Sequence, residues 1–226
     1  MIKYYDEVVQ GSDQWLELRR GILTASEMKY IITPTLKVAD NEKQRSHCHE
    51  LLAQRITGHV EPQYIGEAML RGQADEVDAV IAYGKTYAPV QSMGFIINDK
   101  WGFSIGYSPD GLVGDDGLVE VKSRCGKYQI ETILAGEMPS EYMIQVQTGL
   151  LVSERKWCDF ISYSAGLPME VIRVYPDAKI QEAILKAATA FNECLVTKLA
   201  TYIAALADNK RRFVATERRV EVEMYV

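Results

Sequence analysis

Residues 108–122 constrain the fold more than any other part of the chain, because they place ionisable side chains around a predicted strand turn. Before the turn, residues 103–107 alternate apolar residues with small or polar ones, and after it residues 118–122 are rich in strand formers. The Gly-Asp-Asp-Gly run at 114–117 has the composition of a turn. This pattern predicts an antiparallel hairpin and therefore a sheet near the middle of the chain.

Three charged side chains fall on this hairpin: Asp110, Glu120 and Lys122. Side chains two residues apart on a strand share a face, so Glu120 and Lys122 project together, and Asp110 leaves the partner strand beside them. Neighbouring carboxylates suit a cation such as Mg²⁺, and a lysine can orient or deprotonate a water, or stabilise a pentacovalent phosphorane. The stretch therefore predicts phosphodiester hydrolysis. The alternative is an ordinary turn beside a solvated Glu/Lys pair.

Composition places the chain among ordinary globular proteins. It has 226 residues, of which 47% are hydrophobic and 25% charged. No apolar run approaches the roughly 18 residues of a membrane span, and the N-terminus does not resemble a signal peptide. We therefore expect a cytoplasmic location and no membrane association. The four cysteines form no Cys-x-x-Cys pair, and adjacent residues such as His47 and Cys48 cannot chelate one ion from a helix.

The formal net charge of −6 argues against a protein that coats nucleic acid by bulk attraction. Basic residues nevertheless occur in clusters, as a nuclease would need along the path of its substrate. A cluster of this kind is also compatible with a solvated surface. The clusters lie at residues 19–20, 37, 43–45, 122–127, 210–212 and 218–219.

Periodicity and punctuation predict alternating helical and extended segments. Helices are expected at about 12–20, 24–34, 42–57, 66–83, 127–135, 140–152 and 177–209. Strands are expected at about 94–98, 103–107, 118–122, 156–163 and 170–175. The tail at 211–226 alternates and could add a strand or a subunit contact.

Three polar features outside the hairpin carry a functional interpretation beside a plain one. Thr24 and Glu27 form a capping box at a predicted helix start, just after Arg19, which suits a phosphate group but also serves simple capping. Gln145 interrupts an apolar helix, so its amide either bonds the sheet backbone or holds the lysine or a water. Glu76 is one of several acids on a helix, and is either a metal ligand or solvated.

Taken together, these blocks resemble the PD-(D/E)xK nuclease superfamily and, within it, the phage-lambda-type exonucleases. The matching motifs occur in the same order over about residues 10–165: Trp15-x-x-Leu18-Arg19-x-Gly21-x-Leu23-Thr24-Ala25-Ser26-Glu27, Gly72-x-x-x-Glu76, Ser108-Pro109-Asp110-Gly111, Glu120-Val121-Lys122 and Tyr142-Met143-x-Gln145-Val146-Gln147. One departure is Thr35 after Pro34, where relatives place an arginine soon after the proline.

The resemblance implies an α/β (α+β) fold with a restriction-endonuclease-like core, in which a central mixed β-sheet of about five strands is flanked by α-helices. It implies a single domain over residues 1–226. Its parts would be a helical N-terminal region (10–85), a catalytic sheet core (93–176), and a long helix with a tail (177–226).

The resemblance also implies a 5′-to-3′ exonuclease that degrades the 5′-ended strand of linear duplex DNA to mononucleotides, leaving a 3′ overhang for single-strand annealing. The expected cofactors are two Mg²⁺ ions, for which Mn²⁺ would substitute, held by Glu76, Asp110, Glu120 and the Val121 carbonyl. The expected catalytic residues are Asp110, Glu120, Lys122 and Gln145. Arg19, Ser26 and Ser108 would bind the 5′-phosphate, and Met69 or Leu70 would separate the strands, although core packing is the alternative for Met69.

The partners implied are double-stranded DNA ends, two further copies of the chain in a homotrimeric ring, and a single-strand annealing protein of a phage or prophage recombination system. Two alternatives share the fold. One is a structure-specific endonuclease, and the other is an inactive scaffold that binds DNA ends during recombination.

Overall fold

The strands of the protein form two four-stranded sheets in a computed structural model that describes residues 1–61 and 66–218. The first sheet has the order β1-β3-β4-β2 and the second the order β5-β6-β7-β8. The strands are β1 (Ile2–Tyr5), β2 (Leu23–Thr24), β3 (Phe95–Asn98), β4 (Ile105–Tyr107), β5 (Gly111–Val113), β6 (Gly117–Ser123), β7 (Trp157–Tyr163) and β8 (Glu170–Val174).

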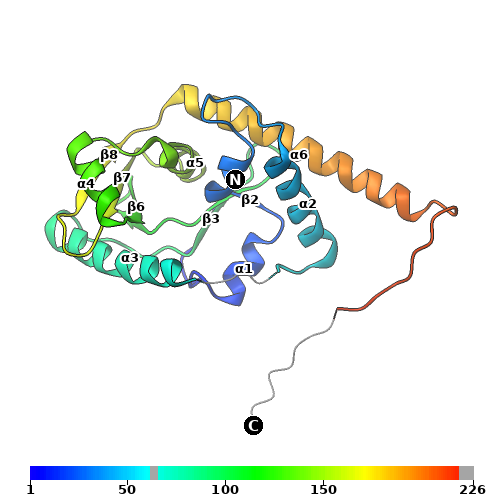
Figure 1. Cartoon of the computed structure of the whole chain (residues 1–226), viewed down its shortest axis with the longest axis horizontal. Helices are drawn as coiled ribbons and strands as arrows, with labels where there is room; N and C mark the ends of the chain where they lie inside the picture. Colours follow the sequence, from blue (N-terminus) through cyan, green and yellow to red (C-terminus); the bar gives the residue numbers. More distant parts are fainter. Residues whose placement is uncertain (62–65, 219–226) are drawn as a thin grey trace, which may run out of the picture.

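Helices lie on both sides of the strands (Figure 1). The α-helices are α1 (Asp13–Arg19), α2 (Glu42–Thr57), α3 (Glu67–Thr86), α4 (Gly126–Ala135), α5 (Met143–Ser153) and α6 (Ala178–Leu206). Two 3-10 helices complete the set, η1 (Ala25–Tyr30) and η2 (Ser140–Tyr142).

Local sequence explains where several helices begin or end. The Ser12 side chain accepts a hydrogen bond from the Trp15 backbone and caps α1, as predicted. Thr24 and Glu27 form the predicted capping box, but the helix that follows is the 3-10 helix η1, which ends at Tyr30 rather than near residue 34. At α2, Gly58 has a φ of 66°, the left-handed conformation that glycine tolerates best at a helix end.

The predicted hairpin is partly wrong. The strand that pairs with β6 in antiparallel fashion is β5, which follows Asp110, whereas β4 belongs to the other sheet. The turn lies between β5 and β6, at the Gly-Asp-Asp-Gly run, as predicted. Pro109 explains the break between β4 and β5, because its ring removes a backbone donor from what reads in sequence as one extended strand.

The expected mixed sheet flanked by helices is confirmed. Strand β6 pairs with β5 in antiparallel and with β7 in parallel orientation, and β7 pairs with β8 in antiparallel orientation. The strand count differs from the expected five because β1, β2 and β5 are short, and short strands carry little periodicity.

The two faces of β6 pack against different helices. Leu118 joins a buried cluster with Val146 and Leu150 of α5, whereas Val119 and Val121 pack with α3. Because side chains alternate along a strand, Glu120 and Lys122 share the face of Leu118. The α5 layer therefore covers the face of the sheet that carries the charged residues.

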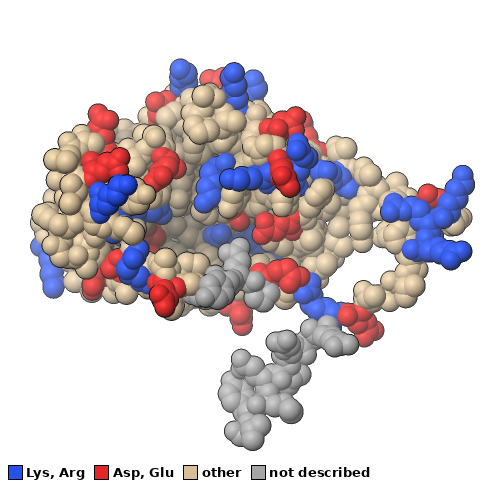
Figure 2. Space-filling view, in the orientation of Figure 1, with Lys and Arg blue, Asp and Glu red and all other residues tan. Residues whose placement is uncertain are grey.

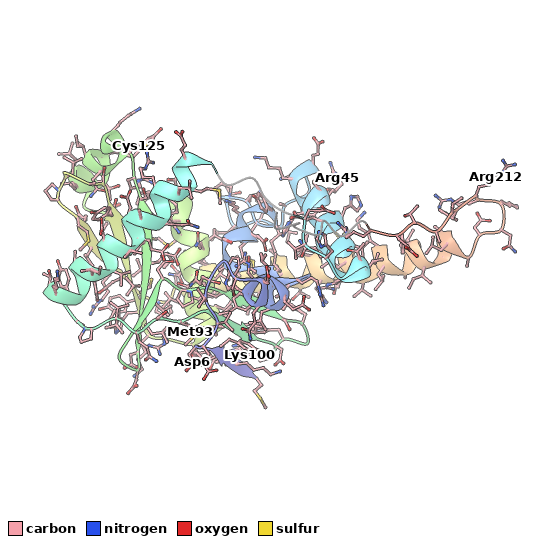
Figure 3. All side chains as sticks on the ribbon, turned by 90° about the horizontal axis from the view of Figure 1, so that it is seen from below. Asp6, Arg45, Met93, Lys100, Cys125 and Arg212 are labelled. Carbon is pink, nitrogen blue, oxygen red and sulfur yellow. The ribbon has the colours of Figure 1, made fainter. Side chains whose placement is uncertain are left out.

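Helix α6 extends well beyond the body of the protein (Figure 1). Its buried residues all lie in its first 18 positions: Ile184, Ala187, Ala188, Phe191 and Leu195. The basic cluster at residues 210–212 follows the helix at the tip of this arm, where Arg212 lies far from Cys125 at the other end of the molecule (Figures 2 and 3). Residues 211–218 form no strand, and the rest of the predicted tail strand falls outside the described residues. No helix among the described residues has the length and apolar character needed to cross a membrane.

Candidate active site

Asp110 is held against β6 by two hydrogen bonds. Its backbone N–H donates to the Val119 carbonyl at 3.2 Å, and its side-chain Oδ2 accepts from the Val121 N–H at 2.6 Å. The Asp110 carboxylate thus extends the antiparallel pairing before the start of β5. It accepts the Val121 N–H in place of a backbone carbonyl of the neighbouring strand. This places Asp110 beside the charged face of β6, as expected.

Glu120 lies at the centre of the site and is only 1% exposed. Its Oε1 accepts hydrogen bonds from Lys122 Nζ at 2.6 Å and from Gln145 Nε2 at 2.5 Å, and its Oε2 accepts one from the Tyr107 hydroxyl at 2.8 Å. The three donors satisfy a buried carboxylate that would otherwise be costly. The Gln145 amide therefore binds the glutamate directly, a contact that the sequence did not predict.

Burial and neighbouring charges shift the pKa values of Asp110 and Lys122. Burial, followed by the Glu120 charge, raises the pKa of Asp110 well above its usual range. Burial acts to lower the pKa of Lys122, but the Glu120 and Asp110 carboxylates outweigh it, so the pKa of Lys122 is raised. Burial and the crowding of carboxyl groups around a single lysine thus favour the protonated form of Asp110.

Glu76 reaches the site from α3, which packs on the opposite face of β6. The Asp75 carboxylate accepts a hydrogen bond from the Ser123 hydroxyl at 2.5 Å and so ties α3 to the end of β6. Burial and, after it, the nearby Glu120 charge raise the pKa of Glu76. No group of three or more His, Cys, Asp or Glu side chains in residues 1–61 and 66–218 has the arrangement of a metal site. Glu76 is therefore near Asp110 and Glu120 without completing a three-carboxylate set.

An aromatic and basic wall borders the lysine. Lys122 Nζ lies 5.7 Å from the centre of the Tyr142 ring. Arg124 Nη1 donates to the Tyr142 hydroxyl at 2.8 Å and to the exposed Glu141 carboxylate at 2.7 Å. Two cations therefore flank Tyr142, next to the acidic centre of the site.

The predicted phosphate-binding residues come together through two residues that were not predicted to take part. Trp15 Nε1 donates to Ser108 Oγ at 2.9 Å, and the Arg19 guanidinium lies 4.2 Å from the centre of the Trp15 ring. Thr24 Oγ1 lies 3.4 Å from Arg19 Nη2 and 3.3 Å from Ser26 Oγ. Burial lowers the pKa of Arg19, although the nearby Glu27 charge opposes this shift, and among the described residues no acidic side chain forms a salt bridge with Arg19. A partly desolvated guanidinium that no carboxylate contacts directly suits an anion.

The two residues expected to separate the strands lie in the first turn of α3. Met69 is 49% exposed and Leu70 is 56% exposed. Core packing, the alternative for Met69, is therefore wrong.

The hydrogen bond from Tyr107 to Glu120 was not predicted from the sequence at all. Tyr107 was assigned only to a strand, and no local pattern links a tyrosine in one sheet to a glutamate in another. The nearest signal was its position directly before the Ser108-Pro109-Asp110 motif.

Comparison with known families and structures identifies relatives of this chain. A family model described as "YqaJ-like viral recombinase domain" matches residues 14–156. The crystal structure of an alkaline exonuclease (LHK-Exo) from Laribacter hongkongensis is 32% identical, covering 87% of this chain and 98% of that protein, with a TM-score of 0.77. A structure of LHK-Exo in complex with dAMP matches equally well. The expected resemblance to this class of exonuclease is confirmed.

A phage-related exonuclease from Haemophilus somnus shares the fold at 13% identity, with a TM-score of 0.56 over 79% of this chain and 96% of that one. No curated protein matches the chain.

Proposed function

Because this chain belongs to the family of YqaJ-like viral recombinase domains, we propose that it is an exonuclease acting at the ends of linear double-stranded DNA. The family and the alkaline exonuclease relative support a nuclease role in recombination. In our proposal the enzyme hydrolyses the 5′-ended strand to 5′-mononucleotides in the 5′-to-3′ direction and leaves a 3′ single-stranded overhang. The observation that carries the proposal is the convergence of Asp110, Glu120 and Lys122 at one buried point of β6.

The donor set at this point fits divalent cations, and we propose Mg²⁺, with Mn²⁺ as a substitute. Burial and, after it, the Glu120 charge raise the pKa values of Asp110 and Glu76, and carboxylates in such a setting gain most from a cation that binds oxygen. Asp110, Glu120 and the Val121 carbonyl would hold the metal, and Glu76 would complete a second position. Bound there, two ions would activate a water and neutralise the charge that develops on the phosphate.

The chain's own residues supply the remaining chemistry. Lys122, which the raised pKa keeps as an ammonium, would donate to the attacking water or to a phosphate oxygen. Gln145 keeps Glu120 in place from α5, so the lysine and the carboxylate stay on one side of the reacting group. Positioning of this kind contributes through orientation rather than through new bonds.

Metal affinity should depend on pH. Below their raised pKa values Asp110 and Glu76 hold protons that a cation must displace, so we expect Mg²⁺ affinity to increase with pH, by up to about tenfold per pH unit for each proton released. For the same reason the metal-free fold binds extra protons and loses stability as pH rises through these values. Titration calorimetry with Mg²⁺ in two buffers of different ionisation enthalpy measures both affinity and proton release. The same affinity across a series of pH values, with no proton release, would contradict this prediction.

The cluster of Arg19, Ser26 and Ser108 is the proposed seat of the terminal 5′-phosphate. The guanidinium forms no salt bridge with a described acidic side chain, and two hydroxyls lie within one shared network around Thr24 and Trp15. Met69 and Leu70 would act as the wedge that opens the terminal base pair, because both apolar side chains are exposed at the start of α3.

Arg19→Ala is expected to lower the preference for 5′-phosphorylated over 5′-hydroxyl ends by about tenfold or more, since charge-assisted hydrogen bonds contribute about 1.5–3 kcal/mol. Arg20→Ala is the matched control. Arg20 is the next residue, but its guanidinium contacts the Gly58 carbonyl at 3.1 Å and the Glu17 carboxylate. Initial rates on the two duplexes measure the preference. An unchanged ratio in Arg19→Ala would remove this residue from the phosphate seat.

The proposed partners follow from the proposed reaction. They are duplex DNA ends, two further copies of the chain in a ring that encloses the duplex, and a single-strand annealing protein that receives the overhang. The proposed setting is the cytoplasm of a host that carries a phage or prophage.

The decisive experiment compares mononucleotide release in Mg²⁺ from three linear duplexes and one closed circle. The linear duplexes carry 5′-phosphate, 5′-hydroxyl or blocked 5′ ends. Release from the phosphorylated duplex, with the circle left intact, supports the proposal. Cutting of the circle would instead make the protein an endonuclease, and no release at any metal concentration would leave only a DNA-binding role.

A further inference from the structure

Tyr107 connects the two sheets at the candidate site. It ends β4 in the first sheet, is 1% exposed, and donates its hydroxyl hydrogen to Oε2 of Glu120, which belongs to β6 in the second sheet. We propose that Tyr107 is a positioning residue that fixes the Glu120 carboxylate for metal binding. This inference rests on the proposed function.

The ring of Tyr107 fits against α5 only because residue 149 is a glycine. A Cβ atom at Gly149 would lie 2.6 Å from the Tyr107 Cζ atom, closer than such atoms approach in proteins. One turn earlier on α5, Gln145 donates to the other oxygen of Glu120. The close approach of ring and helix therefore sets the positions of two donors, one for each carboxylate oxygen.

The three donors on Glu120 are distributed unequally. Lys122 and Gln145 both bind Oε1, so Tyr107 is the only described protein donor to Oε2. Without it, the two remaining donors would hold the carboxylate at Oε1 alone, and the position of Oε2 would be less restrained. Partners that orient a metal-binding carboxylate typically contribute about ten- to a hundredfold in metal affinity or activity.

Tyr107→Phe tests the inference because it keeps the ring and its fit against Gly149 while removing the hydroxyl. Tyr83→Phe is the matched control. Tyr83 is also 1% exposed and donates its hydroxyl hydrogen to a buried carboxylate, that of Asp159, at 2.6 Å, but it lies in the cluster on the opposite face of β6. The two variants thus delete the same kind of hydrogen bond on different faces of the sheet.

Two measurements separate positioning from general loosening of the fold. Calorimetric titration of the DNA-free protein with Mg²⁺ should show about ten- to a hundredfold weaker binding in Tyr107→Phe and unchanged binding in Tyr83→Phe. In nucleotide-release assays, the Mg²⁺ concentration that gives half of the maximal rate should rise only in Tyr107→Phe.

Wild-type Mg²⁺ affinity in Tyr107→Phe would overturn the inference, and so would an equal loss in both variants. The calorimetric result does not require cleavage. If the wild-type protein binds Mg²⁺ but releases no nucleotides, the proposed function fails while the difference between the two variants still decides the role of Tyr107. A wild-type protein that binds no Mg²⁺ would overturn both.

Discussion

Asp110→Asn and Lys122→Met are each expected to slow mononucleotide release by about a thousandfold or more, equivalent to about 4 kcal/mol of transition-state stabilisation. The first change removes the charge of a metal-binding carboxylate, and the second removes the ammonium that binds Glu120. Both substitutions preserve shape. The fold should tolerate Asp110→Asn, because the amide oxygen of the new side chain can still accept the hydrogen bond from the Val121 N–H. Single-turnover assays on a 5′-phosphorylated duplex measure the loss.

Duplex binding in the absence of metal should survive both changes, because affinity for DNA is spread over many phosphate contacts. Asp115→Asn in the turn before β6 and Lys127→Met in α4 are matched controls, since both side chains are exposed. The controls should retain wild-type rates. Near-wild-type cleavage by either Asp110→Asn or Lys122→Met would move the chemistry away from this site.

Asp159→Ala is expected to lower the free energy of unfolding by about 3 kcal/mol, and the melting temperature by about 6–12 °C. Asp159 is 2% exposed and accepts hydrogen bonds from the Tyr83 hydroxyl at 2.6 Å and from Arg173 Nε and Nη2 at 2.7 and 2.8 Å. Its removal leaves the buried Tyr83 hydroxyl without an acceptor, and α3 loses a tie to β7.

Asp116→Ala is the control for this loss of stability, because it deletes an exposed ion pair with Lys156 that spans 2.9 Å. Exposed pairs contribute little, so we expect a change of at most about 0.5 kcal/mol. Urea unfolding followed by circular dichroism measures both variants. Equal effects would show that burial does not govern the contribution of the Asp159 network.

The sequence was most informative where short-range chemistry decides the structure. The bounds of the helix at 42–57 and the caps at Ser12 and Thr24 follow from local hydrogen bonds, and the structure reproduces them. The hairpin partner of β6 was assigned wrongly because the alternating segment at 103–107 comes shortly before the turn, and alternation alone does not show that the chain changes sheets between residues 107 and 111.

In the candidate site, too, the contacts within one strand could be predicted, and those that depend on tertiary packing could not. Glu120 and Lys122 share a face because of strand geometry, so their proximity could be predicted from their spacing. The contacts of Gln145 and Tyr107 with Glu120 depend on how α5 and the first sheet pack. Gln145 is 25 residues and Tyr107 is 13 residues from Glu120 in sequence, so no local periodicity in the sequence indicates these contacts. Sequence reasoning therefore found the charged residues that share a strand, but not the contacts that hold them.

The position of Trp15 gives the protein an optical reporter of its own. The indole lies beneath the Arg19 guanidinium and donates to Ser108, so both neighbours belong to the proposed phosphate seat. Indole emission responds to nearby charge and to hydrogen bonding, and the chain has only three tryptophans. In a variant that keeps Trp15 alone, arrival of a DNA end should therefore be visible as a change in fluorescence, without a dye attached to either partner.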